Sequence, residues 1–196
     1  MELQDQQSIA ASRHRVFEAL NDPEILRQCI PGCETLTKRS DHEMDATVSM
    51  KVGPIKAKFN GSVTLNNLNP PEGYSITGEG SGGGAGFAKG GADVCLIEDG
   101  PSTILQYNVK VDVGGKLASL GARLIESVAK KLSGEFFEKF ATLVESANQE
   151  SASAFISEET ANAETGIVAD RFSRTYICIA AGVIAVALAA IWLAMR

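Results

Sequence analysis

Several stretches of the chain alternate strictly between apolar and polar side chains. Residues 42–52, 55–65 and 105–113 each place an apolar side chain at nearly every second position, with charged, hydroxyl or amide side chains between. A period of two predicts β-strands with one buried and one solvated face, which is typical of antiparallel sheets. Turn sequences at residues 53–54 and 69–73 separate neighbouring strands. The pattern therefore predicts six or seven strands in an antiparallel meander.

Helical patterns fill the gaps around these strands. Ser12 can cap a short helix that ends near Leu20, and Asp22 followed by a proline can start a second helix over residues 23–29. Residues 116–147 show the apolar period of one long amphipathic helix. Its predicted apolar stripe comprises Leu117, Leu120, Leu124, Val128, Leu132, Phe136, Phe140 and Val144.

The order of these elements defines the fold class. A strand, two short helices, a run of antiparallel strands and a long C-terminal helix predict an α+β helix-grip fold, in which a curved sheet of six or seven strands wraps around the helix. A sheet and helix that diverge at one end leave a cavity between them. Gly121 and Gly134 fall inside the predicted helix, where each costs up to about 1 kcal/mol relative to alanine. They either make room for a ligand or allow close packing on the sheet.

Composition divides the chain into three parts. Residues 1–147 have the size of one domain, residues 148–175 are expected to form a flexible linker, and residues 176–195 form an uncharged apolar stretch long enough to cross a bilayer as one helix. Arg171 and Arg174 precede this stretch, and the first residues contain no apolar signal segment. We therefore expect a single-pass protein of the cytoplasmic membrane whose domain faces the cytoplasm.

Glycine is concentrated where two neighbouring strands should lie. Nine of the 19 residues from 73 to 91 are glycine, and strand parity places Gly78, Gly80, Gly84, Gly86 and Gly90 on the inward face. Glycine weakens a strand and fills no core. One interpretation is that these positions line a tunnel for an apolar ligand. The other is that glycine permits strong curvature, bulges or a close approach of the helix. A bulge at residues 90–91 would turn Phe87 inward.

The predicted ligand site is apolar, and catalytic groups are scarce. No inward strand position is expected to carry a charge, and His14 and His42 lie in polar contexts. Tyr107 is the polar residue whose inward orientation the alternation predicts most clearly. An apolar cavity with one or two hydroxyl groups suits binding better than catalysis. The predicted lining residues are Val48, Met50, Phe59, Ile76, Gly78, Gly80, Gly86, Phe87, Tyr107, Val109, Leu117, Leu120, Leu124 and Val128.

Charge and cysteine content narrow the remaining functions. The net charge is −6, and the chain has no basic stripe that could neutralise phosphates, so nucleic acid is not an expected partner. The domain is mildly acidic throughout, and the C-terminal helix rather than electrostatics is expected to hold it on lipid. Cys29 and Cys33 have no second ligand pair nearby, so no metal site is expected.

Two segments of the chain resemble a known family. Residues 23–34 read PEILRQCIPGCE and residues 52–59 read VGPIKAKF. Together they resemble the CoxG subunit of carbon monoxide dehydrogenase, a family of the START/Bet v 1-like (SRPBCC) superfamily, over about residues 1–147. The resemblance implies a helix-grip fold and an accessory role for a molybdenum carbon monoxide dehydrogenase or a related hydroxylase. The resemblance identifies no catalytic residue in this chain.

The resemblance and the predicted anchor together suggest a route for electrons. A tethered apolar cavity could recruit the enzyme to the membrane, hold an isoprenoid quinone such as menaquinone or ubiquinone, and link the enzyme to respiratory electron transport. The alternatives are a docking or maturation subunit with a filled core and no ligand of its own, a lipid-transfer protein, and a cyclase-like or hydrolase-like enzyme.

Overall fold

The structure is a computed structural model that describes residues 2–159 of the chain. Its regular elements are β1 (Glu2–Ile9), α1 (Arg13–Ala19), α2 (Pro23–Cys29), β2 (Cys33–Lys38), β3 (Glu43–Val52), β4 (Ile55–Asn69), β5 (Gly73–Ser81), η1 (Gly83–Ala85), β6 (Phe87–Asp99), β7 (Ser102–Gly114), η2 (Ala118–Leu120) and α3 (Ala122–Glu159). The predicted order of a strand, two short helices, a strand meander and a long helix is confirmed.

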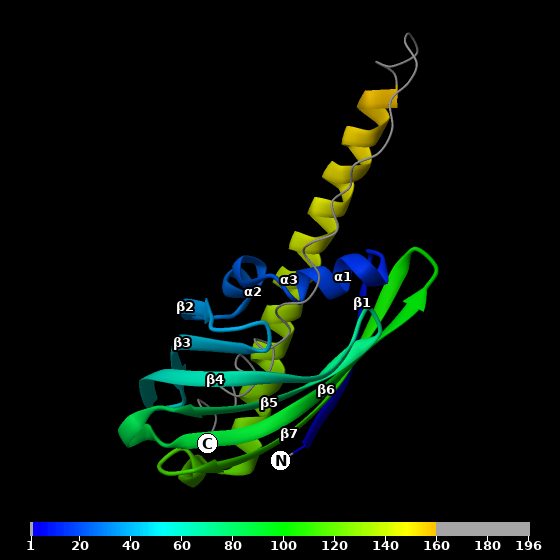
Figure 1. Ribbon diagram of the computed structural model, residues 1–196. Helices are drawn as coiled ribbons and strands as arrows, with labels where there is room; N and C mark the ends of the chain where they lie inside the picture. Colours follow the sequence, from blue (N-terminus) through cyan, green and yellow to red (C-terminus); the bar gives the residue numbers. More distant parts are fainter. Residues whose placement is uncertain (1, 160–196) are drawn as a thin grey trace.

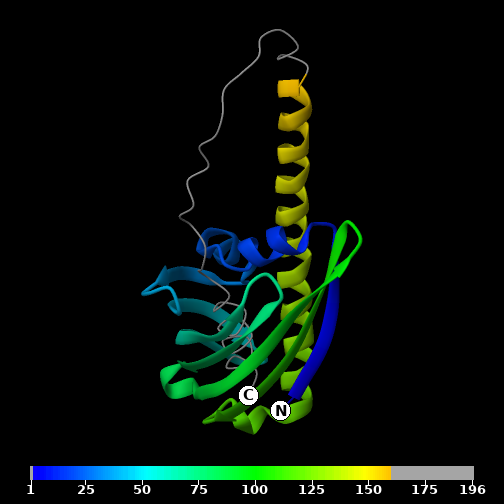
Figure 2. The ribbon, with the colours of Figure 1, turned by 45° about the vertical axis from the view of Figure 1, so that its right-hand side comes forward.

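All seven strands form one antiparallel sheet in the order β1-β7-β6-β5-β4-β3-β2. Strands β2 to β7 are a meander of successive neighbours, and β1 completes the sheet by pairing with β7, from Glu2 opposite Lys110 to Ile9 opposite Thr103. The sheet curves around α3, which lies against its concave side (Figures 1 and 2). This arrangement is the α+β helix-grip fold that the order of elements predicts.

Both short helices begin where the sequence places their caps. The Ser12 hydroxyl accepts a hydrogen bond from the Arg15 backbone N–H at 3.4 Å. Asp22 Oδ1 accepts one from Glu24 N–H at 2.8 Å, and Pro23 occupies the first turn of α2. Such caps satisfy backbone donors that the helix itself cannot bond. The two helices cross the end of the sheet from which α3 projects (Figure 1).

The long helix differs from the prediction at both ends. It begins at Ala122 rather than near residue 116, because the preceding residues form the 3₁₀ turn η2 and Gly121 adopts a φ of +89°. It continues to Glu159, through residues 148–159 that we expected to belong to a flexible linker. That stretch contains three Glu and two Ala residues, which favour helices. Gly121 therefore precedes the helix, whereas Gly134 lies inside it.

The backbone of α3 lies closest to α2, α1 and the edge strand β1, not to the central strands. Large side chains bridge the wider gap, among them Phe136, Phe137 and Phe140, each at most 4% exposed. The core thus lies between the concave face of the sheet and one face of α3.

No helix of residues 2–159 is long and apolar enough to cross a membrane. The rest of the expected linker, residues 160–175, and the expected transmembrane segment, residues 176–195, lie outside the described residues.

Candidate ligand-binding interior

The strand residues that the apolar–polar alternation predicts to point inward do lie on the inward face of the sheet. Six predicted lining residues on β3, β4, β5 and β7 are each at most 9% exposed: Val48, Met50, Phe59, Ile76, Tyr107 and Val109. Cross-strand register places Val48 opposite Phe59 and Tyr107 opposite Val94, so each shares its face with an apolar neighbour. Their inward orientation is confirmed. Because these side chains are closed off from solvent, a ligand among them would lie in an enclosed interior rather than in an open groove.

The predicted stripe on the long helix is only partly correct. Leu117 is fully buried, Leu120 and Val128 are half-buried, and Leu124 is 40% exposed. The prediction assumed one continuous helix from residue 116, whereas η2 and the turn at Gly121 change the helical phase. The residues of α3 that are buried are Ile125, Ala129, Ser133, Phe136, Phe137, Phe140 and Val144.

Two of the predicted lining glycines face atoms rather than open space. A methyl group at Gly78 would lie 2.8 Å from Cγ1 of Val63 on β4. A methyl group at Gly86, whose φ is +136°, would collide with the carbonyl oxygen of Gly114. Gly90 is similarly close to the Lys110 carbonyl. These contacts favour the interpretation that glycine permits curvature and close strand approach, and they contradict the expected space at Gly78 and Gly86. Gly84, also expected to face inward, lies exposed in η1.

Phe87 lies on the outer face of the sheet and is 56% exposed. The inward turn expected for it required a bulge at residues 90–91, but β6 and β7 keep their register through Gly90 opposite Val111 and Gly91 opposite Lys110. The Phe87 ring instead covers Gly114, where a methyl group would approach its Cε1 to 2.5 Å. Phe87 is therefore not a lining residue of the interior.

A hollow of about 690 Å³ opens on the polar outer face of the sheet, and Gly80 and Phe87 contribute to it. Gly80 belongs to a row of small residues that crosses four strands, with Ala46, Gly61 and Ala88 as its neighbours in register. Most of the other lining side chains are charged or polar, including Asp45, Asn60, Glu79 and Lys89. This hollow lacks the apolar character predicted for the ligand site, so we do not equate the two.

Tyr107 forms the polar part of the interior beside α3. Its ring stacks on Phe137, with centroids 5.1 Å apart. Burial and the nearby charge of Asp5 raise the pKa of Tyr107 to about 12, and the Ser133 hydroxyl partly offsets them. Asp5 lies directly opposite Tyr107 in the β1–β7 register. The expectation that no inward strand position carries a charge is therefore wrong, because an edge strand can keep an inward carboxylate hydrated, and Asp5 is exposed.

Two buried hydroxyl groups in this interior meet no partner at ordinary hydrogen-bond geometry within the described part of the chain, although one of them, on Ser133, lies close enough to Tyr107 to lower its pKa. They belong to Ser133 on α3 and Tyr74 on β5, each 3% exposed. Burial raises the pKa of Tyr74 strongly, and its ring meets Phe17 of α1 edge-on. Neither residue was among the predicted lining residues. The alternation along β5 from Ile76 would have placed Tyr74 on the inward face. The inward orientation of Ser133 could not be predicted without knowing that α3 begins at Ala122.

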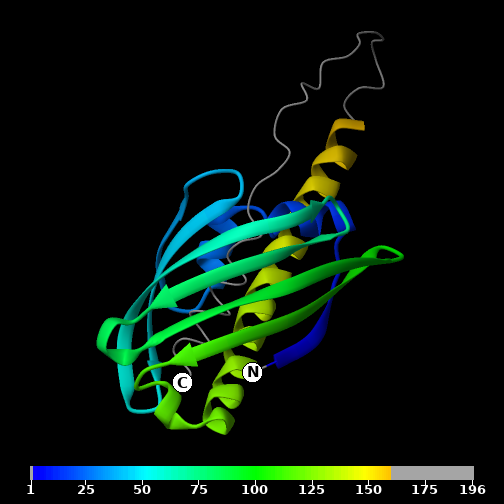
Figure 3. The same cartoon turned by 60° about the horizontal axis from the view of Figure 1, so that its bottom comes forward.

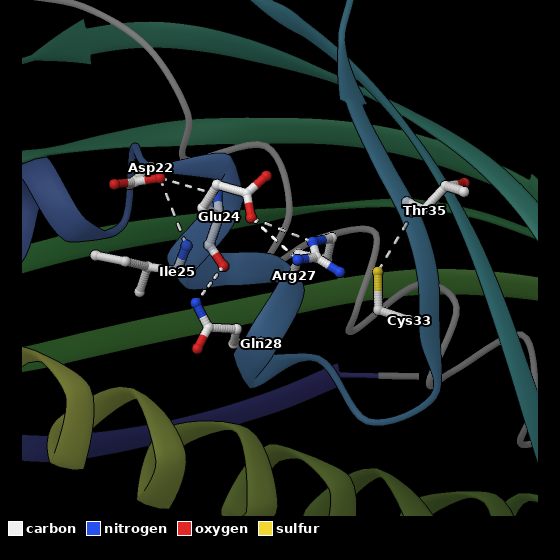
Figure 4. Close-up of polar contacts among 7 residues, drawn as sticks. All are labelled: Asp22, Glu24, Ile25, Arg27, Gln28, Cys33 and Thr35. Carbon is white, nitrogen blue, oxygen red and sulfur yellow. Dashed lines mark hydrogen bonds and ion pairs between the residues drawn. The ribbon is translucent and has the colours of Figure 1, made fainter.

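The two cysteines around the Ile-Pro-Gly turn are placed as ordinary packing residues. Cys29, at the end of α2, is fully buried, and desolvation raises the pKa of its thiol to about 12. The Cys33 thiol, also with a raised pKa, donates a hydrogen bond to the Thr35 carbonyl at 3.5 Å (Figure 4). Within residues 2–159, no cluster of three or more His, Cys, Asp or Glu side chains could hold a metal ion.

Comparisons with known proteins agree with this geometry. The family model that describes the CoxG subunit of carbon monoxide dehydrogenase matches residues 6–145. A conserved protein of Geobacillus kaustophilus has a similar structure, with 27% identity, a TM-score of 0.71, and coverage of 75% of this chain and 97% of that chain. The search of curated proteins found no match.

More distant structures show the fold alone. A protein of Thermus thermophilus is 14% identical, with a TM-score of 0.58 over 75% of this chain and 99% of its own. The Zhui aromatase/cyclase from a Streptomyces species is 11% identical, with a TM-score of 0.54 over 74% of this chain and 93% of its own.

Proposed function

The chain belongs to the CoxG family of carbon monoxide dehydrogenase subunits, and from this premise we propose that it is a non-catalytic accessory protein that binds an apolar ligand between its sheet and α3. The ligand class that fits best is an isoprenoid quinone, such as menaquinone or ubiquinone. The proposed partner is a molybdenum carbon monoxide dehydrogenase or a related hydroxylase.

The observation that carries this proposal is the buried hydroxyl group of Tyr74, which has no hydrogen-bond partner within residues 2–159. The Ser133 hydroxyl, which interacts with Tyr107, is a second donor in the same interior. Leaving a buried polar group unpaired costs about 1–3 kcal/mol, and such groups in native proteins call for an explanation. A ligand with carbonyl oxygens would accept hydrogen bonds from hydroxyl groups while its apolar body lies among Val48, Phe59 and Val109. A quinone combines both chemistries.

A role in electron transport follows from the family and from the expected anchor. We propose that the partner enzyme oxidises its substrate in the cytoplasm and passes the electrons to a quinone dissolved in the membrane. A protein held at the cytoplasmic membrane through residues 176–195 would recruit the enzyme and bring a quinone to it. Among the described residues, no charged group contributes to the raised pKa of Tyr74, and a buried hydroxyl group without an acid–base partner suits a carrier better than a cyclase.

The direct test is mass spectrometry of lipids extracted from the full chain after purification in mild detergent. We expect about one quinone per chain, and a reduced amount in Tyr74→Phe and Ser133→Ala. Thr103→Val is the matched control, since the Thr103 hydroxyl is buried but already donates to the Ala11 carbonyl at 2.8 Å. Recovery of no quinone or other lipid from folded protein would contradict the proposal.

A second candidate is a docking or maturation subunit with a filled interior. The tight contacts at Gly78 and Gly86, together with the low exposure of the inward strand residues, favour it. In that case the folded chain would bind the partner enzyme without any extracted ligand, and Tyr74→Phe and Ser133→Ala would bind the enzyme as well as the unmodified chain does.

A further inference from the structure

Three turns meet at the end of the sheet opposite α1 and α2, and we call this region the loop end: residues 53–54, 82–86 and 115–121 (Figure 3). The Leu117 N–H donates to the Ala85 carbonyl at 3.0 Å, which joins the second and third turns. A methyl group at Gly53 would lie 3.4 Å from Cδ2 of Leu124, so the first turn adjoins the start of α3. These contacts make the loop end one continuous surface.

The loop end is basic although the whole chain carries a net charge of −6, so the expectation that the domain is mildly acidic throughout is wrong for this region. Its exposed cations are Lys51, Lys56, Lys116 and Arg123, and none makes an ion pair with another described residue. The surrounding segments 46–71, 80–92 and 113–125 contain no acidic residue. Lys51 and Lys56 lie directly opposite each other across the β3–β4 hairpin, an arrangement that is destabilising for like charges. A partner of opposite charge would relieve this repulsion.

An apolar tip lies beside these cations. Leu124 is 40% exposed at the first turn of α3, and Pro54 is exposed in the adjoining turn. A leucine flanked by basic side chains can enter the acyl boundary while the cations meet phosphate headgroups. A stable protein partner would instead need a shaped surface of about 800 Å² on each side, and one exposed leucine with exposed cations does not provide one.

We propose that the loop end docks on an anionic lipid surface, with Lys51, Lys56, Lys116 and Arg123 at the headgroups and Leu124 in the acyl boundary. This contact is separate from the expected C-terminal anchor and does not depend on whether the interior holds a ligand. The helix α3 is about 57 Å long and ends at the opposite pole. Residues 160–175 can span at most about 55 Å, so the loop end and the expected anchor reach the same bilayer only when α3 is tilted from the membrane normal.

The test places an indole at the tip of the full chain. Leu124→Trp is made in a Trp192→Phe background, and the protein is reconstituted in vesicles of equal phosphatidylglycerol and phosphatidylcholine that contain brominated lipid. We expect strong bromine quenching of the introduced indole that weakens in high salt and in pure phosphatidylcholine. Because each cation near an anionic membrane contributes roughly a fivefold change in the docking equilibrium, Lys51→Glu with Lys56→Glu should abolish the quenching.

Lys89→Glu with Lys139→Glu is the matched control, because it changes the net charge equally and, like Lys51 and Lys56, these two exposed lysines make no ion pair with another described residue. It should leave the quenching unchanged, and circular dichroism should show that both double variants are folded. Absent quenching in anionic vesicles, or equal quenching in pure phosphatidylcholine and after reversal of Lys51 and Lys56, would overturn the proposal. Loss of carbon monoxide dehydrogenase binding on that reversal, with no quenching by lipid, would assign the surface to an acidic protein instead.

Discussion

The ring of Tyr107 on β7 stacks on the ring of Phe137 on α3, with the two planes 24° apart. This contact joins the strand next to the edge of the sheet to the middle of the long helix, where the helix backbone stands away from the central strands. Phe137 also meets Phe136 edge-on, with centroids 5.1 Å apart. The aromatic contact therefore bridges the gap that a closer helix backbone would otherwise fill.

Removing the Phe137 ring should destabilise the fold far more than removing the Tyr107 hydroxyl. Phe137→Ala leaves a cavity in the core and should lower the free energy of unfolding by about 3–5 kcal/mol. Tyr107→Phe keeps the stacked ring and loses only polar contacts near Asp5 and Ser133, so its effect should stay within about 1.5 kcal/mol. Urea unfolding followed by circular dichroism measures both values. Equal losses would mean that the stack does not hold α3 on the sheet.

Gly86 should not tolerate a side chain, whereas Gly84 should. Gly86→Ala places a methyl group against the Gly114 carbonyl at a φ of +136°, and such strain costs about 1–3 kcal/mol. Gly84→Ala meets no atom within 4 Å, and by restricting the unfolded chain it should be neutral or stabilising by up to about 1 kcal/mol. Thermal unfolding of the two variants compares them directly. A neutral Gly86→Ala would restore the interpretation that this position lines open space.

These two glycines also show how far the sequence alone could lead. Period-two alternation places Val48, Phe59 and Tyr107 on the inward face correctly, because each strand has one buried side. Alternation cannot tell whether an inward glycine borders space or a neighbouring backbone, since both situations exclude a side chain. That distinction depends on sheet curvature, which arises from contacts between strands rather than from any one strand.

The helix prediction failed for a related reason. A turn at Gly121 resets the helical phase, so Leu124 is exposed and Ser133 is buried. A single glycine gives no signal of whether it sits inside a helix or before it. The edge position of β1, which brings Asp5 beside Tyr107, is likewise a property of the assembled sheet.

The stability of the protein should decrease as the pH rises from about 9 to 12. Burial raises the pKa of Cys29 from 9.0 to about 12 and that of Tyr107 from 10.0 to about 12. Above pH 9 the unfolded chain releases these protons more readily than the folded chain, so the unfolded state binds fewer protons and the free energy of unfolding falls. Below pH 9 this contribution is fully present.

Urea unfolding across this pH range measures the slope. Cys29→Ala and Tyr107→Phe should each flatten it, whereas Cys95→Ala should not, because the Cys95 thiol is exposed. The same difference predicts that alkylation at pH 8 modifies Cys95 and leaves Cys29 unmodified until the chain unfolds. A slope that is unchanged in Cys29→Ala and Tyr107→Phe would show that neither burial shift is coupled to folding.

The unpaired hydroxyl groups allow a test that separates a ligand site from ordinary core packing. In ligand-free protein, Tyr74→Phe removes a buried hydroxyl group that has no partner among the described residues, and Ser133→Ala removes one that meets no partner there at ordinary hydrogen-bond geometry. Each substitution should therefore be neutral or raise the free energy of unfolding by up to about 1–3 kcal/mol. With a bound quinone, the same substitutions should weaken binding, because they remove hydrogen-bond donors to its carbonyl oxygens. Opposite signs for stability and binding at one residue are the mark of a group retained for a ligand.

Thr103→Val should instead lose about 1 kcal/mol of stability with no effect on binding, because its hydrogen bond to Ala11 is internal. If Tyr74→Phe and Ser133→Ala destabilise the ligand-free chain as Thr103→Val does, the hydroxyl groups serve packing, and the docking role with a filled interior has the stronger support.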